Sequence, residues 1–155
     1  MLFVYRDHQG ACGMSTIAQT RLSNATLLRA GGAGVLAAVA ANVVVRLILG
    51  AVVPLSPDFM PFTLGPIIAF TLLFTLIGVA VLAIVNRVAA NPLRTYNIIG
   101  VIAFFVSLIP NLAGAANPSS MPMGGTGSDY LVLIIFHIVA AVAFLGVLNI
   151  LARRV

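Results

Sequence analysis

The sequence contains no lysine, no glutamate and no tryptophan, and its only acidic residues are Asp7, Asp58 and Asp129. Charged residues make up 7% of the 155 residues, whereas soluble domains carry about 25%. So few charges cannot cover the surface of a water-soluble globule. The single cysteine, Cys12, excludes a disulfide within the chain and a metal site built from several cysteines. The surrounding medium is therefore predicted to be lipid.

What the sequence has instead is four long apolar segments, at residues 27–53, 63–88, 97–116 and 130–152. Hydrophobic residues account for 61% of the chain, and the mean hydropathy is +1.16. A helix needs about 20 apolar residues to cross a hydrocarbon layer about 30 Å thick, and each segment is long enough. We therefore expect an all-α membrane protein in which residues 27–155 form an antiparallel bundle of four transmembrane helices.

The positions of the eight arginines predict the orientation of this bundle. Cytoplasmic flanks of membrane proteins collect basic residues, and seven arginines flank the chain ends and the second connection: Arg6, Arg21, Arg29, Arg87, Arg94, Arg153 and Arg154. The first and third connections hold Asp58 and Asp129 and no arginine. Both termini are thus expected to be cytoplasmic, with Tyr96 and Tyr130 at the two membrane interfaces.

All basic residues are arginines rather than lysines, and alanine, valine, glycine and leucine are abundant. This composition indicates a bacterial protein, so we expect the chain to lie in the bacterial cell (inner) membrane. Nucleic-acid binding requires a basic patch or stripe. The arginines here are scattered along the chain, so no nucleic-acid partner is expected.

Residues 1–26 are predicted to form a polar, flexible N-terminal tail. The first thirteen residues, MLFVYRDHQGACG, differ in character from those that follow, and Met14 offers a second start. Residues 1–13 are therefore either part of the tail or a start-site artefact, in which case Asp7, His8 and Cys12 carry no function.

Three strongly polar residues lie inside the apolar segments at similar depth. Arg46, in the run NVVVRLILG, is about seven residues, or roughly 10 Å, below the outer surface, and His137 and Asn111 fall within about one helical turn of that level. We predict an outer-half ligand site formed by Arg46, Asn111 and His137 with Asn42, Thr71 and Ser107.

Each apolar segment also carries a row of small and polar residues at helical spacing. Such rows allow helices to pack closely in lipid, so we expect them to face the bundle interior. The rows are Ala30, Gly34, Ala38, Asn42 and Arg46; Thr71, Thr75 and Gly78; Gly100, Ala103, Ser107, Asn111 and Gly114; and His137, Ala140, Ala141 and Phe144.

Each of the three polar residues also has a purely structural interpretation. An arginine at mid-bilayer depth costs about 2.5–3.5 kcal/mol, so Arg46 either extends to the outer headgroups, pairs with Asp58 or Asp129, or binds a ligand. His137 is either a neutral imidazole bonded to a neighbouring helix or a protonatable group. Asn111 follows Pro110 and either satisfies a backbone group that the proline frees or contributes to the site.

Several chemistries are excluded. A bis-histidine haem needs a second histidine within the membrane, and no apolar segment contains an acid for a carboxylate proton relay. No nucleophile with a matching base is present, and a membrane enzyme acting on a lipid or a quinone has no residue to support it. We predict no catalytic residue, no metal ligand and no cofactor.

Three stretches resemble small four-span bacterial integral membrane proteins of a domain-of-unknown-function family. They are AANVVVRLILG in the first segment, SLIPNL in the third and FHIVAAVAFLGVL in the fourth. The resemblance covers most of residues 25–152. It implies a four-helix membrane fold and no established activity or cofactor.

Two functions follow as expectations. The first is a structural or accessory membrane bundle, held together by its small and polar rows, which lies in the lipid bilayer and packs against copies of itself or a membrane-protein partner. The alternative is a small-molecule or ion binding or transport component with a pocket around Arg46, Asn111 and His137.

Overall fold

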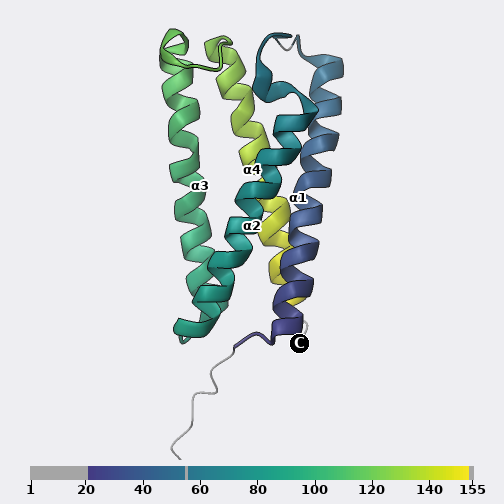
Figure 1. Cartoon of the computed structure of the whole chain (residues 1–155), viewed down its shortest axis with the longest axis vertical. Coiled ribbons are helices and arrows are strands. Elements are labelled where there is room, and N and C mark those ends of the chain that lie inside the picture. Colours follow the sequence, from purple (N-terminus) through teal and green to yellow (C-terminus); the bar gives the residue numbers. More distant parts are fainter. Residues whose placement is uncertain (1–20, 55, 154–155) are drawn as a thin grey trace, which may run out of the picture.

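The computed structural model describes residues 21–54 and 56–153, and these residues form helices joined by short connections (Figure 1). Four helices are long: α1 is Asn24–Val52, α2 is Leu64–Val88, α3 is Pro92–Ala116 and α4 is Gly127–Ala152. Two 3-10 turns, η1 (Met60–Phe62) and η2 (Pro118–Ser120), lie in the connections. The predicted all-α fold with four spans is confirmed. Residues 1–20 of the predicted tail, with Asp7, His8 and Cys12, lie outside the described residues.

Successive helices run in opposite directions and pack as an antiparallel bundle (Figure 1). α1 and α3 each contact α2 and α4; the α1–α4 interface is the most extensive of the four and the α2–α3 interface the least. Arg21 and Arg153, the first and last described residues, lie at one end with the turn of residues 89–91, which we call the terminal end. The connections 53–63 and 117–126 lie at the opposite end, which we call the loop end.

The first and third helices begin earlier than predicted, each for a local reason. The Ser23 hydroxyl accepts a hydrogen bond from the Thr26 N–H at 3.1 Å, which is an N-cap that starts α1 three residues before the predicted position. α3 begins at Pro92 rather than at residue 97. Proline suits the first helical position because its φ is already helical and its missing N–H would be unpaired there. Residues 92–96 are therefore helix, where the sequence indicated a connection.

The fourth helix also begins early, because Asp129 closes a capping box with Thr126. Asp129 Oδ2 accepts hydrogen bonds from the Thr126 N–H at 2.7 Å and from the Ser56 hydroxyl at 2.8 Å. Ser56 belongs to the first connection, so this one carboxylate joins the two loops. Asp129 is only 5% exposed and acts as a structural anchor of the loop end.

Aromatic side chains fill the space beneath the two loops. The ring of Phe59 packs edge-on against Phe62 and Tyr130, with centroid separations of 4.9 and 5.0 Å. The Tyr130 hydroxyl donates to the Gly124 carbonyl at 2.8 Å. These residues belong to a cluster that we call the loop-end core: Phe59, Phe62, Ile67, Tyr130 and Phe136. Tyr130 is thus turned into the bundle rather than towards the lipid interface, where the sequence had placed it.

The predicted small-residue row is confirmed on α1, where Ala30, Gly34, Ala38 and Asn42 are buried. Thr71 and Thr75 of α2 are buried as well. On α3 the row is wrong at Ala103, which is exposed, although Asn111 and Gly114 are buried. Tyr96 rather than Ala103 turns into the bundle on the terminal half of α3. On α4, Phe144 is buried and His137, Ala140 and Ala141 are half-buried.

The outward faces of the helices carry large apolar side chains, among them Leu36, Phe74, Phe105 and Val142. All four helices are long and apolar enough to cross a membrane, yet only 11–22% of their most apolar windows is buried inside the bundle. Soluble monomers rarely expose apolar patches of this extent. The chain is a multi-pass membrane protein whose helices lie in lipid.

Candidate functional site

Asn42 and Thr71 form a buried polar pair between α1 and α2. Asn42 Nδ2 donates to Thr71 Oγ1 at 2.9 Å, and the two residues are 3% and 8% exposed. The other end of the same amide, Asn42 Oδ1, is buried and has no hydrogen-bond partner among the described residues. An unpaired buried acceptor costs about 1–3 kcal/mol, so this oxygen is the most incompletely satisfied polar atom of the predicted site.

Asn111 and His137 form a second polar pair, between α3 and α4. His137 Nδ1 lies 2.9 Å from the Leu133 carbonyl oxygen. A carbonyl can only accept, so Nδ1 carries a proton, and in the neutral imidazole Nε2 is then an acceptor. Asn111 Nδ2 lies 3.5 Å from this Nε2 and can donate to it. The imidazole thus contacts both its own helix and the neighbouring one.

Ser107 contributes to this pair through its backbone and not through its hydroxyl. Its carbonyl accepts from Asn111 Nδ2 at 3.3 Å, while its Oγ donates to the Phe104 carbonyl at 2.7 Å. Pro110 deprives the Val106 carbonyl of its usual helical donor, but Asn111 bonds the next carbonyl along the chain. Asn111 therefore stabilises the helix near the proline without replacing the bond that the proline removes.

Arg46 contacts the first loop. Its Nε donates to the backbone carbonyl of Phe62 in η1, and its guanidinium lies beside Gly50, one helical turn closer to the loop end. The side chain thus extends along α1 towards the loop end, as a snorkelling arginine does. The partner of Nε is a loop carbonyl, and Asp129 accepts from Thr126 and Ser56 instead.

The six candidate residues are thus distributed over three polar sets. The sets are Asn42 with Thr71, Asn111 with Ser107 and His137, and Arg46 with the Phe62 carbonyl. Over residues 21–54 and 56–153, no hydrogen bond joins one set to another. That they share one ligand pocket remains a prediction.

Two further polar connections, both nearer the terminal end, escaped the sequence analysis. Asn97 of α3 and Asn149 of α4 exchange two hydrogen bonds, each 2.9 Å from Nδ2 to Oδ1. Asn86 of α2 bonds both backbone groups of Leu22, accepting from its N–H at 2.8 Å and donating to its carbonyl at 2.9 Å. The signal in the sequence is an asparagine inside an apolar run, but the predicted site included only asparagines in the outer half.

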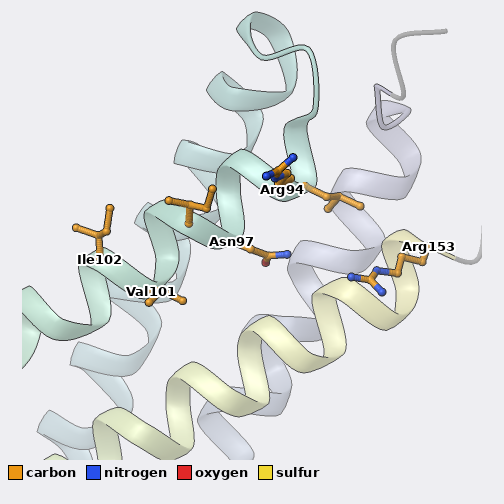
Figure 2. A pocket seen from close by; sticks show the side chains of 7 residues that line it. Arg94, Asn97, Val101, Ile102 and Arg153 are labelled. Carbon is orange, nitrogen blue, oxygen red and sulfur yellow. The ribbon is translucent and has the colours of Figure 1, made fainter. Parts of the chain in front are cut away.

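Two open grooves follow the α3–α4 seam, outside the three polar sets. One, of about 740 Å³, has polar groups at the terminal end and is lined by Leu93, Arg94, Asn97, Ile98, Val101, Ile102 and Arg153 (Figure 2). The other, of about 590 Å³, continues from Val101 and is lined by Phe104, Ile138, Ala141, Val142, Leu145, Gly146 and Asn149. None of the six candidate residues lines either groove.

A family model described as a family of unknown function (DUF6069) matches residues 22–154. The chain belongs to this family. The match contains all four helices and each of the polar sets, and it confirms the resemblance to small four-span proteins of unknown function. No curated protein and no solved structure matches the chain.

In this DUF6069 chain the polar groups of the spans are arranged for hydrogen bonding. The hydroxyls of Ser107 and Thr75 donate to carbonyls of their own helices at 2.7 and 2.6 Å. Within the described part of the chain, no three His, Cys, Asp or Glu side chains lie close enough to hold a metal ion. The contacts of Asn42 with Thr71 and of Asn111 with His137 are the ones that join neighbouring helices.

Proposed function

We propose that this protein is an accessory membrane bundle. Its intramembrane polar residues hold the four helices in one arrangement, and its lipid-facing surface packs against copies of itself or against other membrane proteins. The observation that carries this proposal is that the predicted ligand-binding groups already have partners: Asn42 bonds Thr71, Asn111 contacts His137, and Arg46 bonds a loop carbonyl.

We place the protein in a bacterial inner membrane with both termini in the cytoplasm. The described arginines other than Arg46, which are Arg21, Arg29, Arg87, Arg94 and Arg153, all lie towards the terminal end, and Asp58 and Asp129 lie at the loop end. This asymmetry is the one that basic residues follow in inner-membrane proteins. Reporter tags on the two ends of the full chain should both be found in the cytoplasm. A tag on the far side would overturn this topology.

The structural role of Arg46 is tested by Arg46→Leu, with Arg87→Leu as the matched control. A hydrogen bond to a charged group is worth about 1.5–3 kcal/mol, so Arg46→Leu should lower the free energy of unfolding in detergent by about that amount. Arg87 is exposed in the last turn of α2, and its substitution should change stability by less than about 0.5 kcal/mol. If Arg46→Leu is at least as stable as the native chain, Arg46 does not stabilise the fold.

The partner claim needs a separate measurement. Crosslinking of the full chain in membranes should capture either a second copy or another membrane protein through the exposed apolar faces. A protein that remains a monomer under conditions that crosslink a known oligomer of similar size would contradict this part of the proposal.

The alternative is a binding or transport component, and one observation favours it. Asn42 Oδ1 is buried and without a partner among the described residues, as an acceptor that awaits a ligand would be. Oδ1 can only accept, so it needs a ligand that donates a hydrogen bond, whereas an arginine among neutral donors suits an anionic or carbonyl-bearing group. Small hydroxycarboxylates, which offer both groups, should then raise the melting temperature of the native chain and fail to do so in His137→Leu. No shift for the native chain removes the support for this alternative.

A further inference from the structure

We infer that the α3–α4 seam binds one anionic glycerophospholipid, with the phosphate at Arg94 and Arg153 and an acyl chain along the grooves. This inference concerns a site on the outer surface of the bundle and does not depend on the role of the six residues discussed above.

The charged part of this seam is made by two helices. Arg94 lies in the first turn of α3, and Arg153 follows the last residue of α4. Both are exposed and both line the same groove, with Asn97 one turn further along α3 (Figure 2). Figure 2 shows Arg153 extending from the end of α4 towards the side of α3 that carries Asn97. Two guanidinium groups on neighbouring helix ends can each donate several hydrogen bonds to one phosphate.

The charge around the groove favours an anion. Of the acids in the described part of the chain, Asp58 and Asp129 both lie at the loop end, a bundle length away. Asn97 uses one N–H of its amide in the bond to Asn149, and an amide has two N–H donors. The second N–H can therefore serve a phosphate or an ester oxygen of the same ligand.

Beyond Asn97 the lining of the seam becomes apolar. Ile98, Val101 and Ile102 continue the first groove, and Val101 also lines the second, which runs on between Phe104 and Leu145. The ten residues from Arg94 to Phe104 rise about 15 Å along the helix, so the seam reaches from the bilayer surface towards its middle. A Cβ placed on Gly146 would meet no atom within 4 Å, which shows that the second groove is open at this point.

This order of groups matches a phospholipid better than a free anion. A free phosphate would bind the arginines and leave the apolar part of the seam unoccupied. Basic pockets between transmembrane helices at the membrane surface are a recognised type of site for anionic headgroups. We therefore commit to a lipid with a net negative headgroup, such as phosphatidylglycerol.

The test is a titration of the full chain in detergent, read by native mass spectrometry, with phosphatidylglycerol, phosphatidylcholine and inorganic phosphate as separate ligands. The native chain should bind one phosphatidylglycerol in a saturable manner and at lower concentration than phosphatidylcholine. An arginine near an anionic headgroup contributes about 1 kcal/mol, so Arg94→Gln with Arg153→Gln should weaken this binding about 30-fold. Arg87→Gln, which removes an exposed arginine from the same end outside both grooves, should change it less than about twofold.

A second pair of variants tests the acyl-chain part. Gly146→Leu fills the open groove and should also weaken binding of phosphatidylglycerol, whereas Gly32→Leu, on an equally open face of α1, should not. Melting temperatures of all variants in the same detergent show whether the bundle is intact. The inference is overturned if Arg87→Gln is as damaging as the double variant, if inorganic phosphate binds as tightly as phosphatidylglycerol, or if Gly146→Leu binds like the native chain.

Discussion

At the loop end, Arg46 and Asp129 each hold a loop through hydrogen bonds, whereas at the terminal end Arg87, Arg94 and Arg153 extend from the bundle surface. The same residue type, arginine, therefore has two roles in one small chain. The difference lies in what surrounds the guanidinium. Arg46 is half-buried in an apolar helix and near a loop carbonyl, to which its Nε donates, while Arg87, Arg94 and Arg153 are exposed.

The packing of the two ends differs in the same way. The loop-end core is filled by aromatic rings, and Phe59 and Phe62 are 0% and 2% exposed. The terminal half has a buried core of its own, made mostly of aliphatic residues such as Leu82 and Leu148, but its surface has a groove between α3 and α4 that opens beside two arginines. The difference therefore lies in the loops and the surface. At the loop end, two loops are fixed by hydrogen bonds and packed rings, so substitutions that release a loop should cost more than substitutions of exposed residues at the terminal end.

The largest loss is expected for Gly125→Ala. Gly124 and Gly125 have positive φ angles of 67° and 83°, so alanine at either costs about 1–2 kcal/mol in backbone strain. Only at Gly125 does the added Cβ also collide with the loop-end core, 2.5 Å from Phe59 Cδ2, which adds about 1–3 kcal/mol. Unfolding in detergent should show Gly125→Ala as the less stable variant by that difference. Equal losses for both variants would mean that Phe59 is not packed against the loop.

The next largest effect separates the two acids of the loop end. Asp129→Ala removes the helix cap and leaves the Thr126 N–H and the Ser56 hydroxyl without their acceptor, so we expect a loss of about 1–3 kcal/mol. Asp58 is exposed, and Asp58→Ala should stay within about 0.5 kcal/mol of the native chain. The same unfolding assay measures both. Should the two variants prove equally stable, the carboxylate does not join the loops.

How much of this contrast the sequence could predict depends on the kind of interaction. Hydropathy alone locates the four helices, because a span needs only length and apolar content. Helix periodicity also predicts that Asn42 and Thr71 face the interior. Their pairing, and that of Asn111 with His137, requires knowing which helices are neighbours, and similar depth was the only signal for it.

Other features depend on the path of the loops, which the depth of the polar residues does not indicate. The partner of Arg46 is a carbonyl in η1, and carbonyl positions leave no trace in residue type. The spacing Thr-Gly-Ser-Asp is that of a capping box at Thr126 and Asp129, although Pro, Gly and Ser nearby favour a loop in this region. Tyr96 and Tyr130 were placed at the membrane interfaces by their type alone, whereas the structure turns both into the bundle.

A smaller effect is expected for the reciprocal amide pair of the terminal half. Interhelical hydrogen bonds in membrane bundles average about 0.6 kcal/mol, so Asn97→Ala, Asn149→Ala and the double variant should give a coupling energy of about that size. Asn149→Ala alone should cost more than Asn97→Ala, because Asn149 Nδ2 also bonds the Leu145 carbonyl at 2.8 Å. A coupling above about 2 kcal/mol would exceed the largest values expected for such pairs and would erase the contrast between the two ends.

The smallest change is expected at Asn42, which lies between the two ends. Asn42→Leu removes one hydrogen bond to Thr71, worth about 0.5–1.5 kcal/mol, but it also removes the buried oxygen that lacks a partner, whose desolvation costs about 1–3 kcal/mol. The two contributions oppose each other, so the free energy of unfolding should be nearly unchanged or slightly raised.

Thr71→Val is the matched control: it keeps the shape of the side chain but leaves Asn42 without its acceptor, and it should be the less stable variant. A loss above about 2 kcal/mol for both Asn42→Leu and the smaller Asn42→Val would mean that Oδ1 has a partner after all, because a satisfied amide is costly to remove, whereas overpacking would affect mainly the leucine variant. That partner would have to be a bound molecule or a residue outside the described part of the chain, and the ligand-binding alternative would then be favoured over the accessory bundle.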